Sequence, residues 1–381
     1  MNQDTVDLRP SRRTVLTATG LGAGVLAALP LAPARASASA DTVAAATAAA
    51  ASGDHGWPTP FVVGHRGASA YRPEHTVASW ELAARIGAEV VEPDLVPTKD
   101  GVLVCRHEPE ISGTTDVAEH PEFADRRATK VIDDVEYDGW FTEDFTLAEL
   151  RTLRAVERLP ELRRRNTVFD GLWQVPTFDE ALATRERLSA ELGRTVGIVP
   201  EIKHSSYFRS LGFDVEASVV ATLAAHGLNS AGAPVVVQSF ELTNLVELRT
   251  RYGLRTPTVF LTSAEGAPAD LVAAGDPRQY ADLLIPSSLR DLARYVNQIG
   301  PALGQLTTDL VDDAHAAGLQ VVPYTLRPEN QFLPEEFRVG DDPADWGNVL
   351  DYAQQLFATG IDGIFTDAPD VAVVARDHFA G

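Results

Sequence analysis

The chain has 381 residues, of which 45% are hydrophobic and 23% are charged, and its formal net charge is −22. This is the composition of a globular protein with a large core, and one barrel of roughly 250 residues with insertions accommodates it as well as two ordinary domains do. The strong negative charge argues against nucleic acid as a partner and against electrostatic binding to an anionic membrane surface. An anionic substrate would need a local cluster of positive side chains.

The first forty residues have the pattern of an export signal rather than of a fold. A twin-arginine sequence at residues 11–16 overlaps an apolar run at residues 15–31, and small-residue cleavage sites end at Ala36 and Ala40. We therefore expect a Tat-type signal peptide in residues 1–40 and an exported protein, secreted or held in the cell envelope. An N-terminal membrane anchor is the alternative, but the run is short and is broken by prolines. No stable membrane insertion of the mature chain is expected.

Residues 41–58 are rich in alanine and have no polar face, which predicts a flexible lead-in to a single domain at residues 59–381. Cys105 is the only cysteine of the chain, so no intrachain disulfide can form. The fold must therefore be held by its core, with help from a bound ion if there is one.

From residue 61 onward, short apolar runs alternate with helical patterns. Strands are predicted within the sequences FVVGH, VVEPDLV, VLVCRH, GIVPEIK, PVVVQSF, TPTVFLT, QVVPYTL and GIFTD. Helices are predicted at residues 74–86, 178–192, 215–226, 242–252, 307–317 and 346–358. Apolar strands separated by helices indicate a parallel sheet, and seven or eight such units favour a (β/α)8 TIM barrel over an open sheet. Residues 108–175 are too long and too charged for a simple connection, and predict an insertion after the second or third strand.

Three carboxylates end strands at the predicted rim of this barrel. Glu92 and Asp94 are two residues apart, so their side chains point to the same face of a strand, and Glu201 is similarly placed at the end of the predicted strand GIVPEIK. Buried carboxylates repel one another unless a cation or proton lies between them, and an all-oxygen set suits Ca²⁺ or Mg²⁺ better than Zn²⁺. The alternative is that Arg66 and Lys203 form structural ion pairs with them.

Two histidines end other predicted strands of the same rim, His65 and His107. One imidazole can accept a proton while the other donates one, and each role is worth roughly 10²–10⁴ in rate. Arg66 suits a pair of phosphate oxygens, and Lys203 adds a second positive charge. An acid, a base, a divalent ion and two cations at one place indicate phosphoryl chemistry. Glycosidase chemistry would leave both histidines without a role.

Five motifs, found in the same order, carry a resemblance to a known family. They are GHRGASAYRPEHT, EPDLVPTKDGVLVCRHE, PEIK, PYTLR and IFTDAPD. From residue 61 onward the chain resembles the glycerophosphodiester phosphodiesterase family, in its longer, exported bacterial branch. The resemblance implies metal-dependent hydrolysis of a small-molecule glycerophosphodiester to an alcohol and sn-glycerol 3-phosphate, serving glycerol and phosphate scavenging. Attack by a free glycerol hydroxyl would give a cyclic intermediate.

The same resemblance implies roles for individual residues. His65 and His107 match the acid–base pair of the family, and Arg66 matches its phosphate-binding arginine. The family's ligands for one divalent cation, Ca²⁺ or Mg²⁺, correspond to Glu92, Asp94 and Glu201. Further substrate-binding positions correspond to Lys203, Gln238, Phe240 and Tyr324.

Two positions leave questions open. Glu108 follows His107 where family members usually carry an aspartate, which puts the way His107 is held in doubt. Asp367 and Asp370 fit the closing strand of the family but serve equally well as caps of a turn or helix. Three functions remain as alternatives: cleavage of a teichoic-acid-type polymer, a lysolipid phosphodiesterase or lyase on the same barrel, and a module that binds glycerophosphate without turnover.

Overall fold

The computed structural model describes residues 55–379. The expected signal peptide at residues 1–40 and the lead-in up to residue 54 lie outside the described residues. The strands are β1 (Phe61–Gly64), β2 (Val90–Val91), β3 (Asp94–Pro97), β4 (Leu103–Cys105), β5 (Ala128–Ile132), β6 (Val135–Gly139), β7 (Gly197–Ile198), β8 (Glu201–Ile202), β9 (Val237–Ser239), β10 (Thr258–Thr262), β11 (Gln298–Pro301), β12 (Gln320–Val321) and β13 (Gly363–Thr366).

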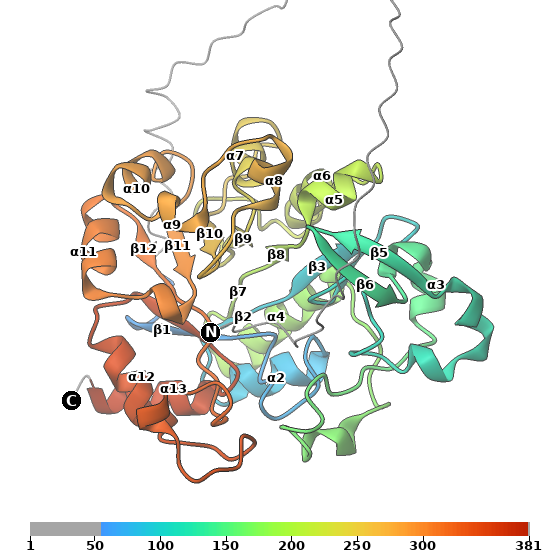
Figure 1. Ribbon diagram of the computed structural model, residues 1–381, viewed down its shortest axis with the longest axis horizontal. Helices are drawn as coiled ribbons and strands as arrows, with labels where there is room; N and C mark the ends of the chain where they lie inside the picture. Colours follow the sequence, from blue (N-terminus) through green and yellow to red (C-terminus); the bar gives the residue numbers. More distant parts are fainter. Residues whose placement is uncertain (1–54, 380–381) are drawn as a thin grey trace, which may run out of the picture.

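Helices surround the central strands on the outside (Figure 1). They are α2 (Val77–Arg85), α3 (Leu147–Leu150), α4 (Phe178–Leu192), α5 (Ser205–Ser210), α6 (Val215–Ala225), α7 (Leu242–Thr250), α8 (Ala269–Ala273), α9 (Tyr280–Leu283), α10 (Pro286–Leu292), α11 (Thr308–Ala316), α12 (Val349–Phe357) and α13 (Pro369–Phe379). Among the residues described, no helix is both long and apolar enough to cross a membrane.

The strands close into a barrel. Parallel ladders run in the orders β13-β1-β2-β7 and β12-β11-β10-β9-β8-β3. One junction between them is a parallel bridge from Ile198 to Val235, and the other includes the amide of Phe365, which donates to the carbonyl of Pro323. The predicted TIM barrel is confirmed. Its interior is filled by a small cluster of apolar side chains: Val63, Val90, Val199, Val322 and Phe365.

Two prolines each divide one barrel strand into two short pieces. Pro93 separates β2 from β3, and Pro200 separates β7 from β8, because proline has no amide hydrogen for the ladder. The alignment continues through both breaks: the carbonyl of Pro93 accepts from the amide of Glu201, and that of Pro200 accepts from Gln238. Both breaks lie at the level of the polar side chains of the rim. The hydrogen bonds across the breaks keep the order of the barrel strands at that level.

Two strand predictions are wrong. The run VLVCRH contains β4, which pairs antiparallel with β3, in register Leu95 to Cys105, and is a return strand rather than a member of the barrel. The barrel strand at residues 298–301 was not predicted, because Gln298 and Gly300 dilute its apolar pattern. The expected number of barrel strands was therefore reached by counting one strand that lies outside the barrel and omitting one that belongs to it.

The helix signals of the sequence are largely local and hold well. In α4 the side chain of Thr177 accepts from the amide of Glu180, whose carboxylate bonds back to Thr177, and Gly193 ends the helix with φ 62°. All six predicted helices occur within their expected ranges, whereas α3, α5, α8, α9, α10 and α13 were not predicted. Packing begins slightly before the predicted boundary at residue 59, because the Trp57 indole donates to the carbonyl of Thr195.

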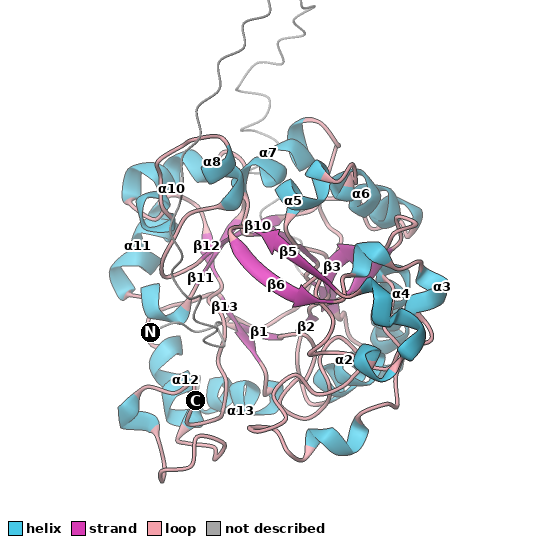
Figure 2. Cartoon of the chain, turned by 45° about the vertical axis from the view of Figure 1, so that its right-hand side comes forward, coloured by secondary structure: helices cyan, strands magenta, loops and turns pink. Residues whose placement is uncertain are grey.

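The segment at residues 108–175 lies between β4 and α4. It carries the antiparallel β5–β6 hairpin, α3 and several short 3₁₀ turns. The hairpin lies next to α5 and close to the opening of the barrel (Figures 1 and 2). Its flank is fixed by Glu143, which accepts from Lys130 of β5 at 2.8 Å and from the hydroxyl of Tyr207 in α5 at 2.6 Å. The segment is therefore attached to the rim at which the polar residues gather.

Candidate active site

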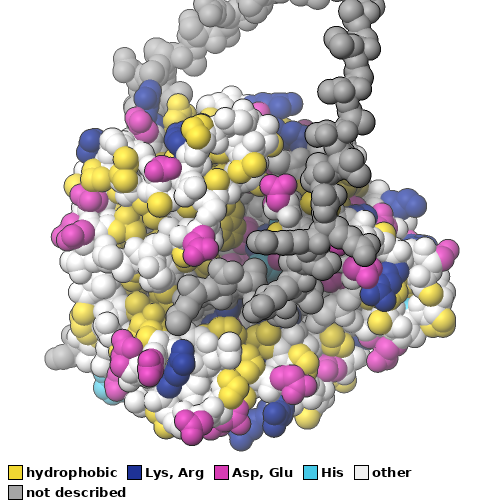
Figure 3. All heavy atoms as spheres, viewed as in Figure 1, with side chains coloured by type: hydrophobic (Ala, Val, Ile, Leu, Met, Phe, Trp, Pro, Cys, Tyr) yellow, Lys and Arg dark blue, Asp and Glu magenta, His cyan; other side chains and the backbone are white. Residues whose placement is uncertain are grey.

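A pocket opens at the carboxyl ends of the barrel strands. Every residue predicted for the site except Asp94 lines this pocket, and two further apolar residues, Leu261 and Phe365, complete its walls. The full lining is His65, Arg66, Glu92, His107, Glu201, Lys203, Gln238, Phe240, Leu261, Tyr324 and Phe365. Acidic and basic side chains are interspersed over the face seen in Figure 3. The positively charged side chains that line the pocket are Arg66 and Lys203.

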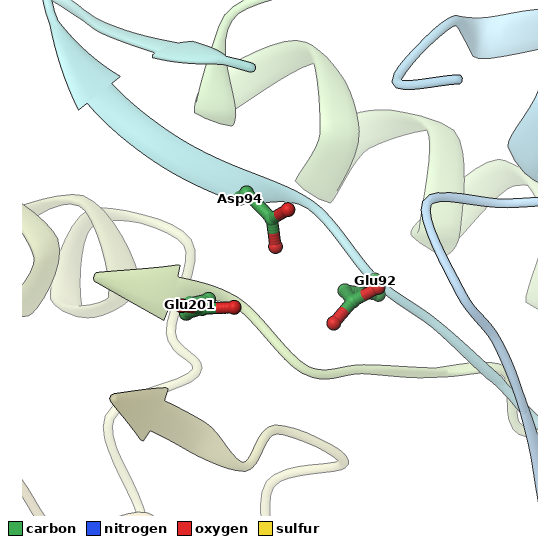
Figure 4. A group of neighbouring side chains, drawn as sticks. All are labelled: Glu92, Asp94 and Glu201. Atoms are coloured by element: carbon green, nitrogen blue, oxygen red, sulfur yellow. The ribbon is translucent and has the colours of Figure 1, made fainter. Parts of the chain in front are cut away.

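Three carboxylates converge beside the pocket. Glu92 lies at the break between β2 and β3, Asp94 begins β3, and Glu201 begins β8 in register with Asp94. One oxygen from each lies within 4.8 Å of the others, and all three side chains are buried. Figure 4 shows them pointing toward one another from neighbouring strands.

Hydrogen bonds hold two of these carboxylates but leave an oxygen free. Glu92 accepts from the Gln238 amide at 2.7 Å and from the backbone N–H of Arg66 at 2.8 Å. Oδ2 of Asp94 lies 2.9 Å from Nε2 of His75, whereas Oδ1 is buried without a hydrogen-bond partner among the described residues. A buried carboxylate oxygen in that state is costly unless a cation reaches it.

The structural ion pairs considered as an alternative do form in part. Nζ of Lys203 lies 2.8 Å from Oε1 of Glu201, and Nε of Arg66 lies 3.6 Å from Oδ2 of Asp94. Arg66 is shared, however, because its guanidinium also donates to Glu74 at 3.0 Å. These two cations do not neutralise the group, so negative charge is left at its centre.

The excess of negative charge changes the pKa values of two of the three carboxylates. Burial, and then the charges of Asp94 and Glu201, raise the pKa of Glu92 well above its usual value. Burial raises the pKa of Glu201 to about 7, although Lys203 opposes this. A proton or a cation must therefore occupy the group at neutral pH. The buried hard-oxygen donors, with one oxygen unpartnered, fit Ca²⁺ or Mg²⁺.

A pH-dependent stability follows from the raised pKa values in metal-free protein. The unfolded chain loses these protons near pH 4.5, whereas the folded chain keeps the proton of Glu201 until about pH 7 and that of Glu92 well above pH 4.5. The stability is therefore present below pH 4.5 and is lost as the pH rises through the raised values. The expected loss is on the order of 1–3 kcal/mol. Glu92→Gln should flatten the fall in melting temperature between pH 5 and 8 in chelator, whereas the exposed control Glu161→Gln should not. Equal slopes in all three proteins would contradict the buried-charge account.

His65 is held from behind by Asp367. Nδ1 of the ring lies 2.5 Å from Oδ1 of Asp367. Burial favours a neutral Asp367, but Arg163 and His65 hold its pKa well below the usual value. An ionised carboxylate only accepts, so Nδ1 of His65 carries the proton and Nε2 is directed toward the pocket, 3.9 Å from Glu92. Burial, and among nearby charges chiefly Arg66, lower the pKa of His65 to about 4, although Asp367 opposes this.

The partners of Asp367 could not be found from the sequence. Arg163, in the inserted segment, donates to Asp367 and lies 2.7 Å from Glu329; it also donates to the carbonyl of Ser69 in the loop after His65. His65 and Asp367 are 302 residues apart, and no local pattern connects them. The open question about Asp367 is thus answered by its contact with the ring.

Asp367→Asn should lower kcat by roughly 10²–10⁴-fold, because an amide no longer fixes the Nδ1–H tautomer of His65 or stabilises its charged form. The matched control is Asp370→Asn in the same motif, where the carboxylate accepts from the hydroxyl of Tyr71. Rates would be normalised to the folded fraction found by thermal melting, because Arg163 also loses a charge partner. Comparable kcat values for the two variants would refute the orienting role.

His107 is held in the same manner by its neighbour. Nδ1 of His107 lies 2.8 Å from Oε1 of Glu108. Burial, Arg66 and Lys203 lower the pKa of His107 to about 3, with Glu108 opposing. Glu108, the departure from the expected aspartate, therefore contacts the ring directly. Each histidine has a carboxylate at Nδ1.

The opposite wall of the pocket is apolar. The rings of Phe240 and Tyr324 meet edge to face with their centroids 5.7 Å apart, and Nζ of Lys203 lies 5.7 Å from the centre of the Phe240 ring. The hydroxyl of Tyr324 donates to the carbonyl of Thr262 and so fixes the ring. This wall offers contact to a small carbon skeleton, while the charged side faces an anion.

The chain is similar to known proteins over most of its length. The profile of the glycerophosphoryl diester phosphodiesterase family matches residues 65–371. A glycerophosphodiester phosphodiesterase of Arabidopsis thaliana is 34% identical over 330 residues, covering 81% of this chain and 83% of the relative. The corresponding Haemophilus influenzae protein is 27% identical, covering 82% and 88%.

Solved structures show the same fold. A phosphodiesterase from Oleispira antarctica, in complex with the product sn-glycerol-3-phosphate, superposes with a TM-score of 0.54 at 22% identity, covering 84% of this chain and 97% of that one. A glycerophosphodiester phosphodiesterase from Agrobacterium tumefaciens gives 0.53 at 19% identity, covering 82% and 99%. Since the family profile extends from the first histidine of the pocket to the last helix, this chain belongs to the glycerophosphoryl diester phosphodiesterase family.

Proposed function

We propose that this protein hydrolyses glycerophosphodiesters to an alcohol and sn-glycerol 3-phosphate, with one divalent cation and a pair of histidines. The observation that carries the proposal is one pocket lined by two imidazoles, each held at Nδ1 by a carboxylate, beside three buried carboxylates. The named activity of the relatives, and the product complex of the Oleispira enzyme, support this substrate class.

In the proposed reaction, positive groups hold the phosphate before any proton moves. Arg66 and Lys203 line the pocket and offset the charge of the non-bridging oxygens. Glu92, Asp94 and Glu201 would hold the divalent cation, which when bound supplies further positive charge to the phosphoryl oxygens. Phe240 and Tyr324 would face the carbon skeleton of the glycerol.

The two histidines then divide the proton transfers. Nε2 of one ring, which is neutral, accepts the proton of the attacking hydroxyl, while the other ring, held as an imidazolium by the negative charge of the bound diester, donates its Nε2 proton to the leaving alkoxide oxygen. Transfer of a proton from the first ring to the second through solvent then restores both. Asp367 and Glu108 hold the Nδ1–H of the two rings, so that Nε2 of each is the atom that exchanges protons with the substrate. Each carboxylate also stabilises the imidazolium form that its ring must pass through.

The proposal includes a location and a purpose. The twin-arginine pattern of the first forty residues supports export, and an exported enzyme of this class would release sn-glycerol 3-phosphate, which after uptake is a source of both glycerol and phosphate. Fractionation of cells that express the full chain, with and without Arg12→Lys and Arg13→Lys, tests the location. Export that does not depend on these arginines would overturn the Tat assignment.

The activity is tested by product analysis on a panel of substrates. Glycerophosphocholine and glycerophosphoethanolamine should release sn-glycerol 3-phosphate with Ca²⁺ or Mg²⁺ present, and chelator should stop the reaction. A teichoic-acid-type polymer and a lysolipid in the same panel test the other substrates considered. Preference for either of these would make it the substrate in place of the small diester. A cyclic product would indicate attack by a glycerol hydroxyl. Binding without turnover would mean that the protein captures glycerophosphodiesters and does not hydrolyse them.

A further inference from the structure

A line of charged side chains leads from the pocket to the inserted hairpin. Nδ1 of His107 lies 2.8 Å from Oε1 of Glu108, whose Oε2 lies 3.1 Å from Nε2 of His204. Nδ1 of His204 then lies 2.6 Å from Oδ2 of Asp133, at the turn between β5 and β6. The proposed reaction uses His107 and the Glu108 carboxylate that holds it, so the other two members of the line, His204 and Asp133, need an explanation.

His204 carries a positive charge on chemical grounds. Both of its partners, Glu108 and Asp133, are carboxylates that accept hydrogen bonds, so both ring nitrogens must donate. Burial opposes this charge, but Asp133 and Glu108 outweigh it and raise the pKa of His204 to about 10. The ring is therefore a fixed cation between two anions, one from the hairpin and one from the catalytic rim.

The backbone at these positions also suggests a selected arrangement. His204 has φ 47°, in the left-handed region that side chains other than Asn and Asp rarely adopt, whereas Asp133 and Asp134, with φ 49° and 64°, form the usual two-residue turn of a β-hairpin. The hairpin also contacts Glu108 directly, because the hydroxyl of Tyr137 lies 3.5 Å from Oε2 of Glu108. His204, from the loop after β8, and Tyr137, from the hairpin, thus both reach the carboxylate that holds His107.

We propose that His204 is a positioning residue that joins the tip of the β5–β6 hairpin to Glu108, and thereby fixes the orientation of the His107 ring. Glu108 has one more rotatable bond than the aspartate expected at its position, so holding Oε1 on His107 requires that Oε2 be held as well. The inserted hairpin is then part of the catalytic apparatus. This inference rests on the proposed acid–base role of His107.

Two substitutions of His204 separate its two contacts. In His204→Gln the side-chain NH₂ takes the place of Nε2 and can still donate to Glu108; in His204→Asn it takes the place of Nδ1 and can donate only to Asp133. We expect the Asn variant to lose roughly 10–100-fold in kcat with KM little changed, and the Gln variant to retain several-fold more activity. Asparagine accepts the left-handed backbone better, so the Asn variant should be the more thermally stable of the two.

Activity and stability should therefore rank in opposite orders, which a purely structural role would not produce. If the Asn variant is as active as the Gln variant, or more active, the positioning role is overturned. His107→Asn, measured in parallel, tests the underlying role separately, because full activity in that variant would remove the acid–base assignment itself, whatever the order at position 204.

The hairpin contact is tested with a matched pair of neighbouring aspartates in the intact protein. Asp133→Asn should speed amide hydrogen exchange in residues 128–139 and lower kcat, because the charge that holds the His204 imidazolium is lost. Asp134→Asn has the same chemistry one residue along the turn and should leave both measurements unchanged. Equal exchange and equal kcat in the two variants would show that the hairpin does not act on the site.

Discussion

His65→Asn should lower kcat by roughly 10²–10⁴-fold or more while leaving metal-dependent stabilisation intact. Asparagine can place its NH₂ where Nδ1 of His65 lies, 2.5 Å from Asp367, so the buried contact that supports the loop is retained. It has no atom in the place of Nε2, the nitrogen directed toward the pocket. The variant therefore removes the proton-transfer atom and little else.

The measurement is initial rate against glycerophosphocholine at saturating Ca²⁺ or Mg²⁺, with melting curves at the same ion concentrations. His226→Asn is the matched control, because that ring lies at the surface, where Nε2 contacts Asp179 at 2.9 Å. Near-normal kcat in His65→Asn would end the acid–base assignment. A loss of activity accompanied by loss of the metal-dependent rise in melting temperature would place His65 in ion binding instead.

Asp94→Asn should abolish both activity and stabilisation by the divalent ion. The substitution keeps the shape of the side chain and removes one of three negative charges that converge within 4.8 Å. An ion present at one hundred times its Kd stabilises the folded state by about 2.7 kcal/mol, and most of this should vanish when binding is weakened. Burial favours a neutral Asp94, but Lys203 and then His75 hold its pKa well below the usual value, so in chelator the variant should melt lower than the wild type because this attraction is lost.

Melting temperature as a function of Ca²⁺ and Mg²⁺ concentration, with the binding isotherm from calorimetry, provides the test. Asp270→Asn serves as a control, since Asp270 is also buried and accepts from the amide of Thr243 outside the carboxylate group. An unchanged ion-dependent rise in Asp94→Asn would mean that the ion binds elsewhere. Undiminished activity of the wild type in chelator would remove the ion from the proposed mechanism.

The parts of the fold that could be predicted are those with local causes. The capping box at Thr177 and the left-handed Gly193 delimit α4, and both are readable along the chain. β4 was misassigned because three buried residues, Leu103–Cys105, look the same whether their partner runs parallel or antiparallel. The direction of pairing is decided by the length of the turn before the strand, which a pattern of apolar residues does not record.

The site divides in the same way. Glu92 and Asp94 could be grouped from their spacing, since alternation along a strand is a local rule. Asp367 and Arg163 could not be assigned to His65, because Asp367 lies 302 residues from His65 and 204 from Arg163, and the three meet only when the barrel closes. The residues that hold the site in place, such as Asp367 and Arg163, were therefore less predictable from the sequence than the residues proposed to act on the substrate.

The inserted segment has a consequence for engineering. Arg163 braces the carboxylate behind one histidine, and the hairpin reaches the carboxylate beside the other. Chimeras that exchange residues 108–175 between relatives, in order to transfer leaving-group preference, would remove both braces at once. On the proposed mechanism such an exchange would also lower turnover, and a successful graft would have to carry the residues that receive each brace.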